Sequence, residues 1–469
     1  MIALLAAAVG CSEPPPPPVV ILVSLDTVRA DRLGAWGNPR GLTPNLDRFA
    51  AEAVVFDQAY AQSNETRYSH ASLFTSRYPS ELGPLDGGFS IPAEVATLAG
   101  VLAAYGWQTA GFVGGGHLAA SYGVNAGFAT WDDAAEWGSL HDTTPRALNW
   151  LDAQSADAPI FLFVHGYDAH DRYLKPTPFG YALTSPVQSD LATRAIRVPG
   201  LTSIIVGGRL LRHEEDIERL TTAQPRFDAL RGPGALAALG SDAEALTGAD
   251  TEAIRNVYDS AVAYADAAFG VLMAGLDARN MVENATIIVV SDHGESLGED
   301  GSFHHRFALT DDTLRVPLLI RLPGGAHGGR HVTGVTELTD VLPTVLDLTG
   351  EVPPARIRGV SLRASLESGS PTPRTVAFSE SALRIVSVRG ADARLTAHGL
   401  GVDNAAIASL IAATPVNGVT LAATGNPAGT AALKSAMVAW RREIEPHPRA
   451  AAPPSEHTSP QNGYWQVNP

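Results

Sequence analysis

Three residues with metal-binding side chains directly follow apolar, strand-like runs of the sequence. The run "VVILVSLD" (residues 19–26) ends at Asp26, and "ATIIVVSDHG" (residues 285–294) delivers Asp292 and His293. In doubly wound parallel sheets, binding sites form beyond the carboxyl ends of the strands. Carboxylates together with an imidazole suit one divalent cation, so these three side chains are candidate ligands for a single metal ion.

A hydroxyl residue, Thr66, stands ahead of a small-residue run in "SNETRYSHASLFTSRYP" (residues 63–79), which resembles the first turns of a buried helix. Two roles are open for it. Thr is a favoured helix N-cap. A hydroxyl held against a metal ion is also an effective nucleophile, because the cation favours its ionised form. The two roles are compatible, and the second predicts that Thr66 converges with Asp26, Asp292 and His293.

Further histidines lie near other strand ends. "VHGYDAH" supplies His165, Asp168 and His170, and "GSFHHRF", 12 residues after Asp292, adds His304 and His305. Each of these has an ordinary structural explanation, since strand-end Asp residues cap turns and buried histidines satisfy backbone groups. Their recurrence at several strand ends favours a site.

Strand-like and helix-like segments alternate along residues 19–369. Strands are predicted over 19–26, 54–61, 107–114, 159–170 and 285–294, and helices over 43–53, 93–106, 144–154 and 251–280. This alternation predicts an α/β fold with a doubly wound, mostly parallel sheet covered by helices on both faces. Residues 174–250 break the rhythm and are interpreted as an insertion. Residues 370–469 are expected to form a small C-terminal α+β subdomain and a tail.

Composition indicates a globular chain whose partners are not nucleic acids. Apolar residues make up 45% of the 469 residues, and the formal net charge is −16. That charge opposes binding to phosphate backbones, and an anionic substrate would need a local cation or a bound metal. One cysteine, Cys11, excludes intramolecular disulfides and thiolate metal clusters. After the N-terminal segment, no apolar run looks long enough to span a bilayer.

The N-terminus, "MIALLAAAVGCSEPPPPPVV", resembles a bacterial lipoprotein signal peptide. An apolar run and small residues precede Cys11, which would carry the lipid, and a proline-rich spacer continues to residue 18. The run lacks a preceding Lys or Arg, and an incidental cysteine in a ragged apolar terminus is the alternative. The lipoprotein interpretation predicts an extracytoplasmic protein, in the periplasm or on the cell surface, that meets the membrane only through its lipid anchor.

Several blocks of the sequence resemble the sulfatases of the alkaline phosphatase superfamily. They are "VVILVSLDTVRADRLGAWG", "TRYSHASLFTSRYP", "FLFVHGYDAH", "VVSDHGESLGEDGSFHH", "LRVPLLIRLPG", "TELTDVLPTVLDLTG" and "IRGVSL", in the family's order over about residues 19–365. The resemblance implies metal ligation by Asp26, Asp292 and His293, with Thr66 at the position of the nucleophile. The family's adjacent second Asp is Thr27 here.

The same resemblance implies roles for three histidines. His70 stands where an Arg supports the nucleophile, His170 is the histidine before the insertion, and His305 takes the place of the cation near the leaving group. Tyr68 replaces the usual Pro two residues after the nucleophile. The family's nucleophile is a formylglycine made from Cys or Ser, and threonine cannot become that aldehyde. Phosphodiesterases and phosphoryl-group transferases of the superfamily, which use Thr, are the closer template.

These observations predict a metal-dependent hydrolase of sulfate or phosphate esters with Thr66 as metal-bound nucleophile. Mixed oxygen and nitrogen ligation favours Mn²⁺ or Zn²⁺ and leaves Ca²⁺ and Mg²⁺ open. The expected substrate is an anionic ester of a glycan, lipid or small molecule. Two alternatives remain: a phosphoryl-group transferase of the same superfamily, and a surface binding protein that keeps the sulfatase fold without catalysis.

Overall fold

A computed structural model gives the fold of most of the chain. The described residues are 16–85, 88–155, 157–170, 173, 204–206, 209–211, 244–245, 248–299, 303–305, 308–382, 385–398 and 420–444. Cys11, the N-terminal signal and the C-terminal tail lie outside them, so the lipoprotein prediction stays a prediction.

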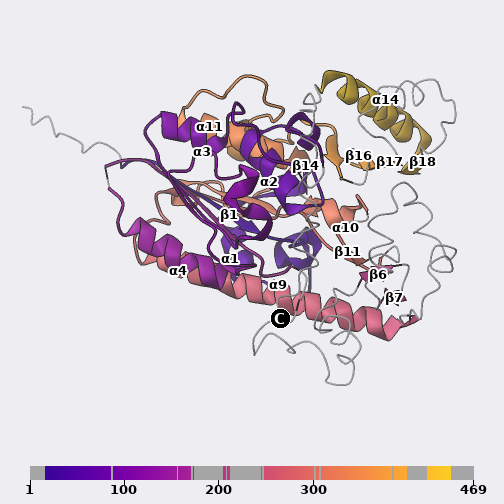
Figure 1. Cartoon of the computed structure of the whole chain (residues 1–469), viewed down its shortest axis with the longest axis horizontal. Helices are drawn as coiled ribbons and strands as arrows, with labels where there is room; N and C mark the ends of the chain where they lie inside the picture. The colour runs from indigo at the N-terminus through magenta and orange to yellow at the C-terminus, as the bar shows by residue number, and fades with distance from the viewer. Residues whose placement is uncertain are drawn as a thin grey trace, which may run out of the picture.

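A nine-stranded sheet forms the centre of the molecule (Figure 1). Its strand order is β12-β2-β13-β9-β1-β5-β3-β4, and β14 pairs with β2. The strands are β1 (Val19–Leu25), β2 (Val54–Tyr60), β3 (Gln108–Phe112), β4 (Thr130–Asp132), β5 (Ile160–Gly166), β9 (Ala285–Val290), β12 (Arg315–Val316), β13 (Leu318–Arg321) and β14 (His331–Glu337). β1 pairs in parallel with both β5 and β9, as the continuous apolar runs predicted. β12 and β13 run antiparallel to their neighbours, which the sequence did not indicate.

Helices cover both faces of this sheet, so the doubly wound prediction is confirmed. α1 (Pro44–Ala51), α4 (Leu140–Leu151) and α9 (Gly248–Asp277) pack on one face, while α2 (Thr66–Thr75), α3 (Leu98–Ala104), α11 (Val341–Thr349) and α12 (Arg363–Ser368) pack on the other. Figure 1 shows α4 and α9 along one side of the sheet, with α3 and α11 opposite. α3 is shorter than the predicted 93–106 because Thr97 accepts a hydrogen bond from the Gly100 amide and caps the helix there.

The expectation that no later apolar run is long enough to span a bilayer was wrong for α9. Residues Ile254–Asp277 are long and apolar enough to cross a membrane by length and composition alone. However, 56% of the most apolar window is buried within the protein, and Val257, Ala261 and Phe269 are fully buried beneath the sheet. We therefore interpret α9 as a core helix.

A smaller antiparallel sheet follows the main domain and confirms the predicted α+β subdomain. β15 (Ala377–Glu380), β16 (Ile385–Arg389), β17 (Arg394–His398) and β18 (Thr420–Thr424) pair in sequence order, and α14 (Pro427–Glu443) packs on β16 and β17. Val388, Leu395, Met437 and Trp440 fill the core between them. Within the predicted insertion, the described residues form a three-stranded antiparallel sheet of β6 (Ile204–Val206), β7 (Arg209–Leu211) and β8 (Glu244–Ala245).

Candidate active site

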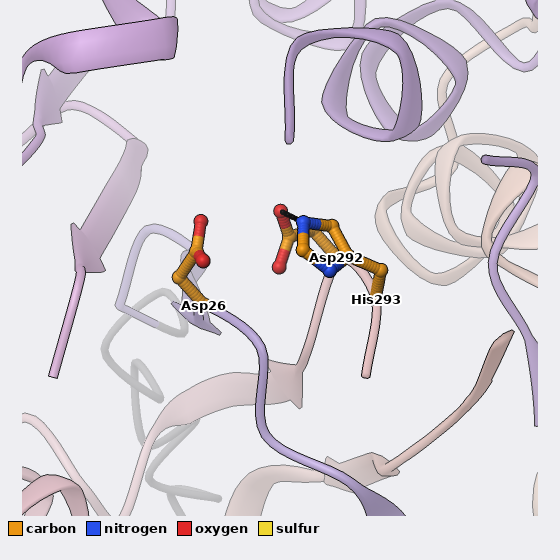
Figure 2. Close-up of side chains that lie close together, drawn as sticks. All are labelled: Asp26, Asp292 and His293. Atoms are coloured by element: carbon orange, nitrogen blue, oxygen red, sulfur yellow. Dashed lines mark ion pairs between the residues drawn. The ribbon is translucent and has the colours of Figure 1, made fainter. Parts of the chain in front are cut away.

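Asp26, Asp292 and His293 meet at the carboxyl edge of the sheet. Asp26 follows β1, and the other two follow the adjacent strand β9. All three are fully buried, and one ligand atom from each lies within 4.8 Å of the others. Figure 2 shows the Asp26 carboxylate pointing toward Asp292 and the His293 ring beside it. The predicted convergence of these three side chains is present in the structure.

The polar atoms of this group do not satisfy one another in a closed hydrogen-bond network. Asp26 Oδ1 and Asp292 Oδ2 are buried and accept no hydrogen bond from the described residues. His293 Nδ1 lies 3.0 Å from the Gly294 carbonyl, so Nδ1 carries the proton and donates it. His293 Nε2 then presents a lone pair 3.4 Å from Asp292 Oδ2. Two lone-pair atoms at this distance fit a cation between them.

Charge balance supports the same interpretation. Among the residues that the structure describes, neither carboxylate forms an ion pair with an arginine or lysine; their charged or chargeable neighbours are histidines. Burial and the adjacent Asp292 carboxylate raise the pKa of Asp26 well above its ordinary value. Two buried carboxylates in contact are unfavourable when both are ionised. A divalent cation would remove that repulsion.

Thr66 lies beside this group and is not a helix cap. Glu65 occupies the N-cap position, and Thr66 is the first residue of α2, a helix whose ten residues are all buried. The Thr66 hydroxyl donates to Asp26 Oδ2 at 3.3 Å and lies 3.4 Å from His293 Nε2. Ser69, one turn later, donates to the Asp292 carbonyl at 2.6 Å and ties α2 to the end of β9.

His70, expected from its position to support Thr66, contacts the first turn of α2. His70 Nδ1 lies 2.8 Å from the Thr66 carbonyl, and Nε2 lies 2.9 Å from Ser24 Oγ. A carbonyl only accepts, so Nδ1 carries the proton and Nε2 accepts from the Ser24 hydroxyl. Burial lowers the pKa of His70, which keeps this neutral tautomer. A neutral imidazole thus fixes the backbone of Thr66.

His165 contacts a predicted metal ligand, a contact that sequence reasoning did not assign. The Gly114 amide approaches His165 Nδ1 at 3.5 Å, so Nε2 carries the proton and donates to Asp26 Oδ2 at 3.2 Å. Burial lowers the pKa of His165 well below its usual value. Thr66 and His165 both donate hydrogen bonds to Oδ2 of Asp26, so Oδ1 is the oxygen that could bind a metal ion. The parallel register that places His165 beside Ser24 is the signal that would have revealed it.

Two further histidines, His305 and His170, lie next to the candidate metal-binding group of Asp26, Asp292 and His293. The His305 ring lies 4.3 Å from the His293 ring, and the His170 ring lies 5.4 Å from His305, centroid to centroid. His305 Nδ1 lies 3.1 Å from Oε1 of Glu295, a buried residue that the sequence interpretation missed. A carboxylate on Nδ1 fixes the orientation of the ring and leaves Nε2 for other contacts.

Other candidates have structural roles. Asp168 Oδ2 accepts the Leu140 amide at the start of α4. Thr27 has a left-handed backbone (φ 60°), and its amide lies 3.3 Å from Asp292 Oδ1. Tyr68 packs edge-on against Phe89, with ring centroids 4.8 Å apart. His304 lies in β11 (Phe303–His304), which pairs with β10 (Ser296–Leu297).

Comparison with known proteins finds sulfatases and a phosphonate hydrolase similar to this chain. The family model described as "Sulfatase" matches residues 18–351. An N-acetylglucosamine-6-O-sulfatase of Bacteroides thetaiotaomicron is 24% identical over 408 residues, covering 75% of this chain and 71% of that protein. A structure in complex with its substrate D-glucosamine-2-N,6-O-disulfate has a TM-score of 0.66 at 20% identity, with 92% and 99% of the two chains covered. A phosphonate monoester hydrolase of Agrobacterium radiobacter has a TM-score of 0.64 at 20% identity, with 91% and 93% covered.

Proposed function

The chain belongs to the sulfatase family, and from that membership we propose that it is a metal-dependent hydrolase of sulfate or phosphate esters with Thr66 as nucleophile. One observation carries the proposal. The Thr66 hydroxyl lies 3.3 Å from Asp26 and 3.4 Å from His293, within a buried Asp-Asp-His group that has the donor set of a divalent metal site. Related sulfatases and the phosphonate hydrolase fold support the reaction class.

Asp26, Asp292 and His293 would hold the metal ion, with the Thr66 hydroxyl beside them. A divalent cation at this position supplies positive charge that favours ionisation of a hydroxyl and binding of an anionic ester. The buried oxygens Asp26 Oδ1 and Asp292 Oδ2 and the lone pair of His293 Nε2 fit such an ion. Mixed oxygen and nitrogen donors favour Mn²⁺ or Zn²⁺.

In the first step Thr66 Oγ1 attacks sulfur or phosphorus while its proton passes to Asp26 Oδ2, the acceptor of its hydrogen bond. The bond from sulfur or phosphorus to the ester oxygen breaks, and the alcohol leaves. Two hydrogen bonds hold Thr66 itself: His70 donates to its carbonyl, and its hydroxyl donates to Asp26. A third, from Ser69 to the Asp292 carbonyl after β9, fixes the first turn of α2. The free amides at the start of α2 contribute a positive partial charge near the transferring oxygens. The product is a covalent ester of Thr66.

The departing oxygen requires a proton, and His305 is placed to donate it from Nε2. Glu295, 3.1 Å from Nδ1, keeps the ring in one orientation with Nε2 directed away from it. His170, 5.4 Å from His305 between ring centroids, borders the same space. His170 would bind non-bridging oxygens of the ester.

The covalent ester at Thr66 is discharged by attack of water at sulfur or phosphorus. The water gives a proton back to His305, and the departing Thr66 oxygen regains its proton from Asp26, which restores the hydroxyl. Threonine permits no release through a hydrated aldehyde, so the second attack must occur at the transferred atom itself. If an alcohol replaces water, the same residues perform a group transfer. Product analysis in the presence of added alcohols separates the hydrolase from the transferase.

An activity panel tests the proposed function. Purified protein, stripped of metal and reloaded with Mn²⁺, Zn²⁺, Ca²⁺ or Mg²⁺, would be assayed with 4-nitrophenyl esters of sulfate, phosphate, methyl phosphate and phenylphosphonate. We expect turnover of at least one ester that depends on the added metal. Stoichiometric metal content without turnover of any ester would instead favour the surface binding protein.

The substrate and location are further parts of this proposal. The sulfated glucosamine bound by a protein of similar fold suggests a sulfated glycan as the substrate class. Lipid attachment at Cys11, which would place the enzyme outside the cytoplasm, predicts that Cys11→Ser leaves the membrane fraction or accumulates as an uncleaved precursor. Unchanged fractionation of this variant would refute the anchor.

A further inference from the structure

Arg67, the residue after Thr66, is a buried cation with no anionic partner in the described structure. Its side chain is 4% exposed, and its buried Nη1 donates no hydrogen bond to any described residue. Its Cζ lies 4.6 Å from the ring centroid of Tyr122 and 5.5 Å from that of Tyr68. The guanidinium is therefore held between aromatic rings.

The other buried arginines of the described chain show how unusual this is. Arg29, Arg321, Arg389 and Arg441 are buried to a similar extent, and each forms an ion pair with at least one carboxylate. A charge moved out of water costs several kcal/mol unless it is paired, and cation–π contacts return only about 0.5–2 kcal/mol each. Within the described part of the chain, Arg67 is thus a buried cation without an ion-pair partner, one residue from the proposed nucleophile.

A series of rings connects Arg67 to the metal-binding group. Four of the rings come from segments that follow β3, β4 and β5, and the last two, His305 and His293, come after β11 and β9. Successive ring centroids are 6.4, 5.4, 5.7, 5.4 and 4.3 Å apart along Tyr122, His117, Trp137, His170, His305 and His293. Aromatic side chains with a few placed polar groups are the usual lining of a site for an organic ligand.

The direction of the side chain separates Arg67 from the group that is transferred. Successive residues of an α-helix project about 100° apart, so Arg67 leaves α2 in a different direction from Thr66. Thr66 points at Asp26 and His293, whereas Arg67 packs on Tyr122, in the 3₁₀ turn Ala120–Tyr122. An anion on Arg67 would therefore be a second group of the substrate, beside the ester at Thr66.

We propose that Arg67, with Tyr122, His117 and Trp137, forms a subsite for a second anionic substituent, a sulfate or carboxylate, on the sugar whose ester is cleaved at Thr66. This rests on the proposed function and specifies its substrate class. A guanidinium matches sulfate and carboxylate oxygens with two parallel hydrogen bonds. In a chain of net charge −16, a buried local cation is needed to attract such a group.

Direct binding tests the subsite independently of turnover. The probes are D-glucosamine-2-N-sulfate, D-glucuronate and neutral D-glucose, titrated by calorimetry into the metal-loaded protein. We expect at least one anionic sugar to bind ten times or more tighter than glucose. Arg67→Gln should remove that preference, whereas Arg48→Gln, on the exposed face of α1, should retain it. Equal binding of all three sugars to the wild type, or an unchanged preference in Arg67→Gln, overturns the proposal.

Kinetics then distinguishes the second anion from the transferred one. If glucosamine-6-O-sulfate and glucosamine-2-N,6-O-disulfate are both turned over, Arg67→Gln should lower the ratio of their kcat/KM values, disulfate over monosulfate, by about tenfold. An equal fall for both esters would place Arg67 on the transferred group and contradict the subsite. Absence of turnover for every ester refutes the proposed function, while the calorimetric result still decides the subsite.

The stability of the free protein gives a readout without ligand. Replacement of an unpaired buried charge by an apolar side chain of similar length should stabilise the fold. We expect Arg67→Met to melt at or above the temperature of the wild type. A melting temperature several degrees lower would show that Arg67 already has the partners it needs, which overturns the proposal.

Discussion

His293 Nε2 faces Asp292 Oδ2 at 3.4 Å with no proton between them, because the ring proton is on Nδ1 and is donated to the Gly294 carbonyl. Asp26 brings a second buried carboxylate to the same point. Because buried acceptors this close repel one another, we predict that the stability of the folded protein depends on a bound cation.

Metal removal should therefore lower the melting temperature. A ligand present at 100 times its Kd stabilises the native state by about 2.7 kcal/mol. We expect chelator-treated protein to melt several degrees below protein in Mn²⁺ or Zn²⁺, as measured by calorimetry. Asp26→Asn should lose this response. His331→Gln, on the exposed edge of β14, should keep it. Metal-independent melting of the wild type would contradict the assignment of the three ligands.

His165 should control metal affinity without contacting the metal. Its Nε2–H holds Asp26 Oδ2, and outer partners of this kind typically contribute about 10–100-fold to metal affinity. His165→Leu should weaken Mn²⁺ or Zn²⁺ binding by that factor in equilibrium dialysis. His165→Gln, which retains an N–H donor, should recover part of the loss. If both variants bind metal as the wild type does, the contact has no role in ligation.

The Glu295–His305 pair should govern the dependence of rate on the leaving group. Proton donation matters most when the departing alcohol is a poor leaving group, and general acids contribute about 10²–10⁴-fold. His305→Ala should slow alkyl esters by this order and 4-nitrophenyl esters much less. Glu295→Gln should show a weaker form of the same pattern. Equal losses for both classes of ester would show that the pair acts only in binding or folding.

Asp312 predicts a pH dependence of stability. Burial raises its pKa to about 6, and Arg29, 3.1 Å away, offsets this only in part. Between pH 3.8, the ordinary pKa of an aspartate, and pH about 6, the folded state holds a proton that the unfolded state has released. The free energy of unfolding therefore falls as pH rises through this window.

Asp312→Asn should remove that fall, so its denaturation midpoint should exceed the wild-type value at pH 7.5 and approach it at pH 4.5. Asp311 is the matched control. Although burial opposes it, Arg389 lowers the pKa of Asp311, so Asp311→Asn should be destabilising at pH 7.5. A destabilised Asp312→Asn at pH 7.5 would show that its bond to Arg29 outweighs its burial.

Much of the fold follows from the sequence because local and tertiary preferences agree. The runs that form β1 and β9 are apolar at nearly every position, as strands buried on both faces must be, and each ends in a metal-binding residue. Strands β12 and β13 could not be assigned in this way. They are two and four residues long and run antiparallel to their neighbours without an intervening crossover helix.

The site was predictable where function depends on residue type and strand position, as for Asp26, Asp292 and His293. It was not predictable where function depends on partners. The hydrogen bond from His165 to Asp26 exists only in the register of β1 against β5. Likewise, the sequence "TRYSH" does not indicate that no described carboxylate pairs with Arg67, because ion pairing depends on every segment that packs around the side chain.

Replacement of Thr66 tests the proposed mechanism most directly, because that mechanism requires its hydroxyl as the nucleophile. The measurement is kcat/KM of metal-loaded Thr66→Ala on the best ester of the panel, with metal content and melting temperature measured on the same sample. Since removal of an attacking atom costs several orders of magnitude in rate, we expect a loss of at least about 10³-fold in a folded, metal-binding protein. If folded, metal-loaded Thr66→Ala hydrolyses the ester at the wild-type rate, then Thr66 is not the nucleophile and the proposed mechanism is wrong.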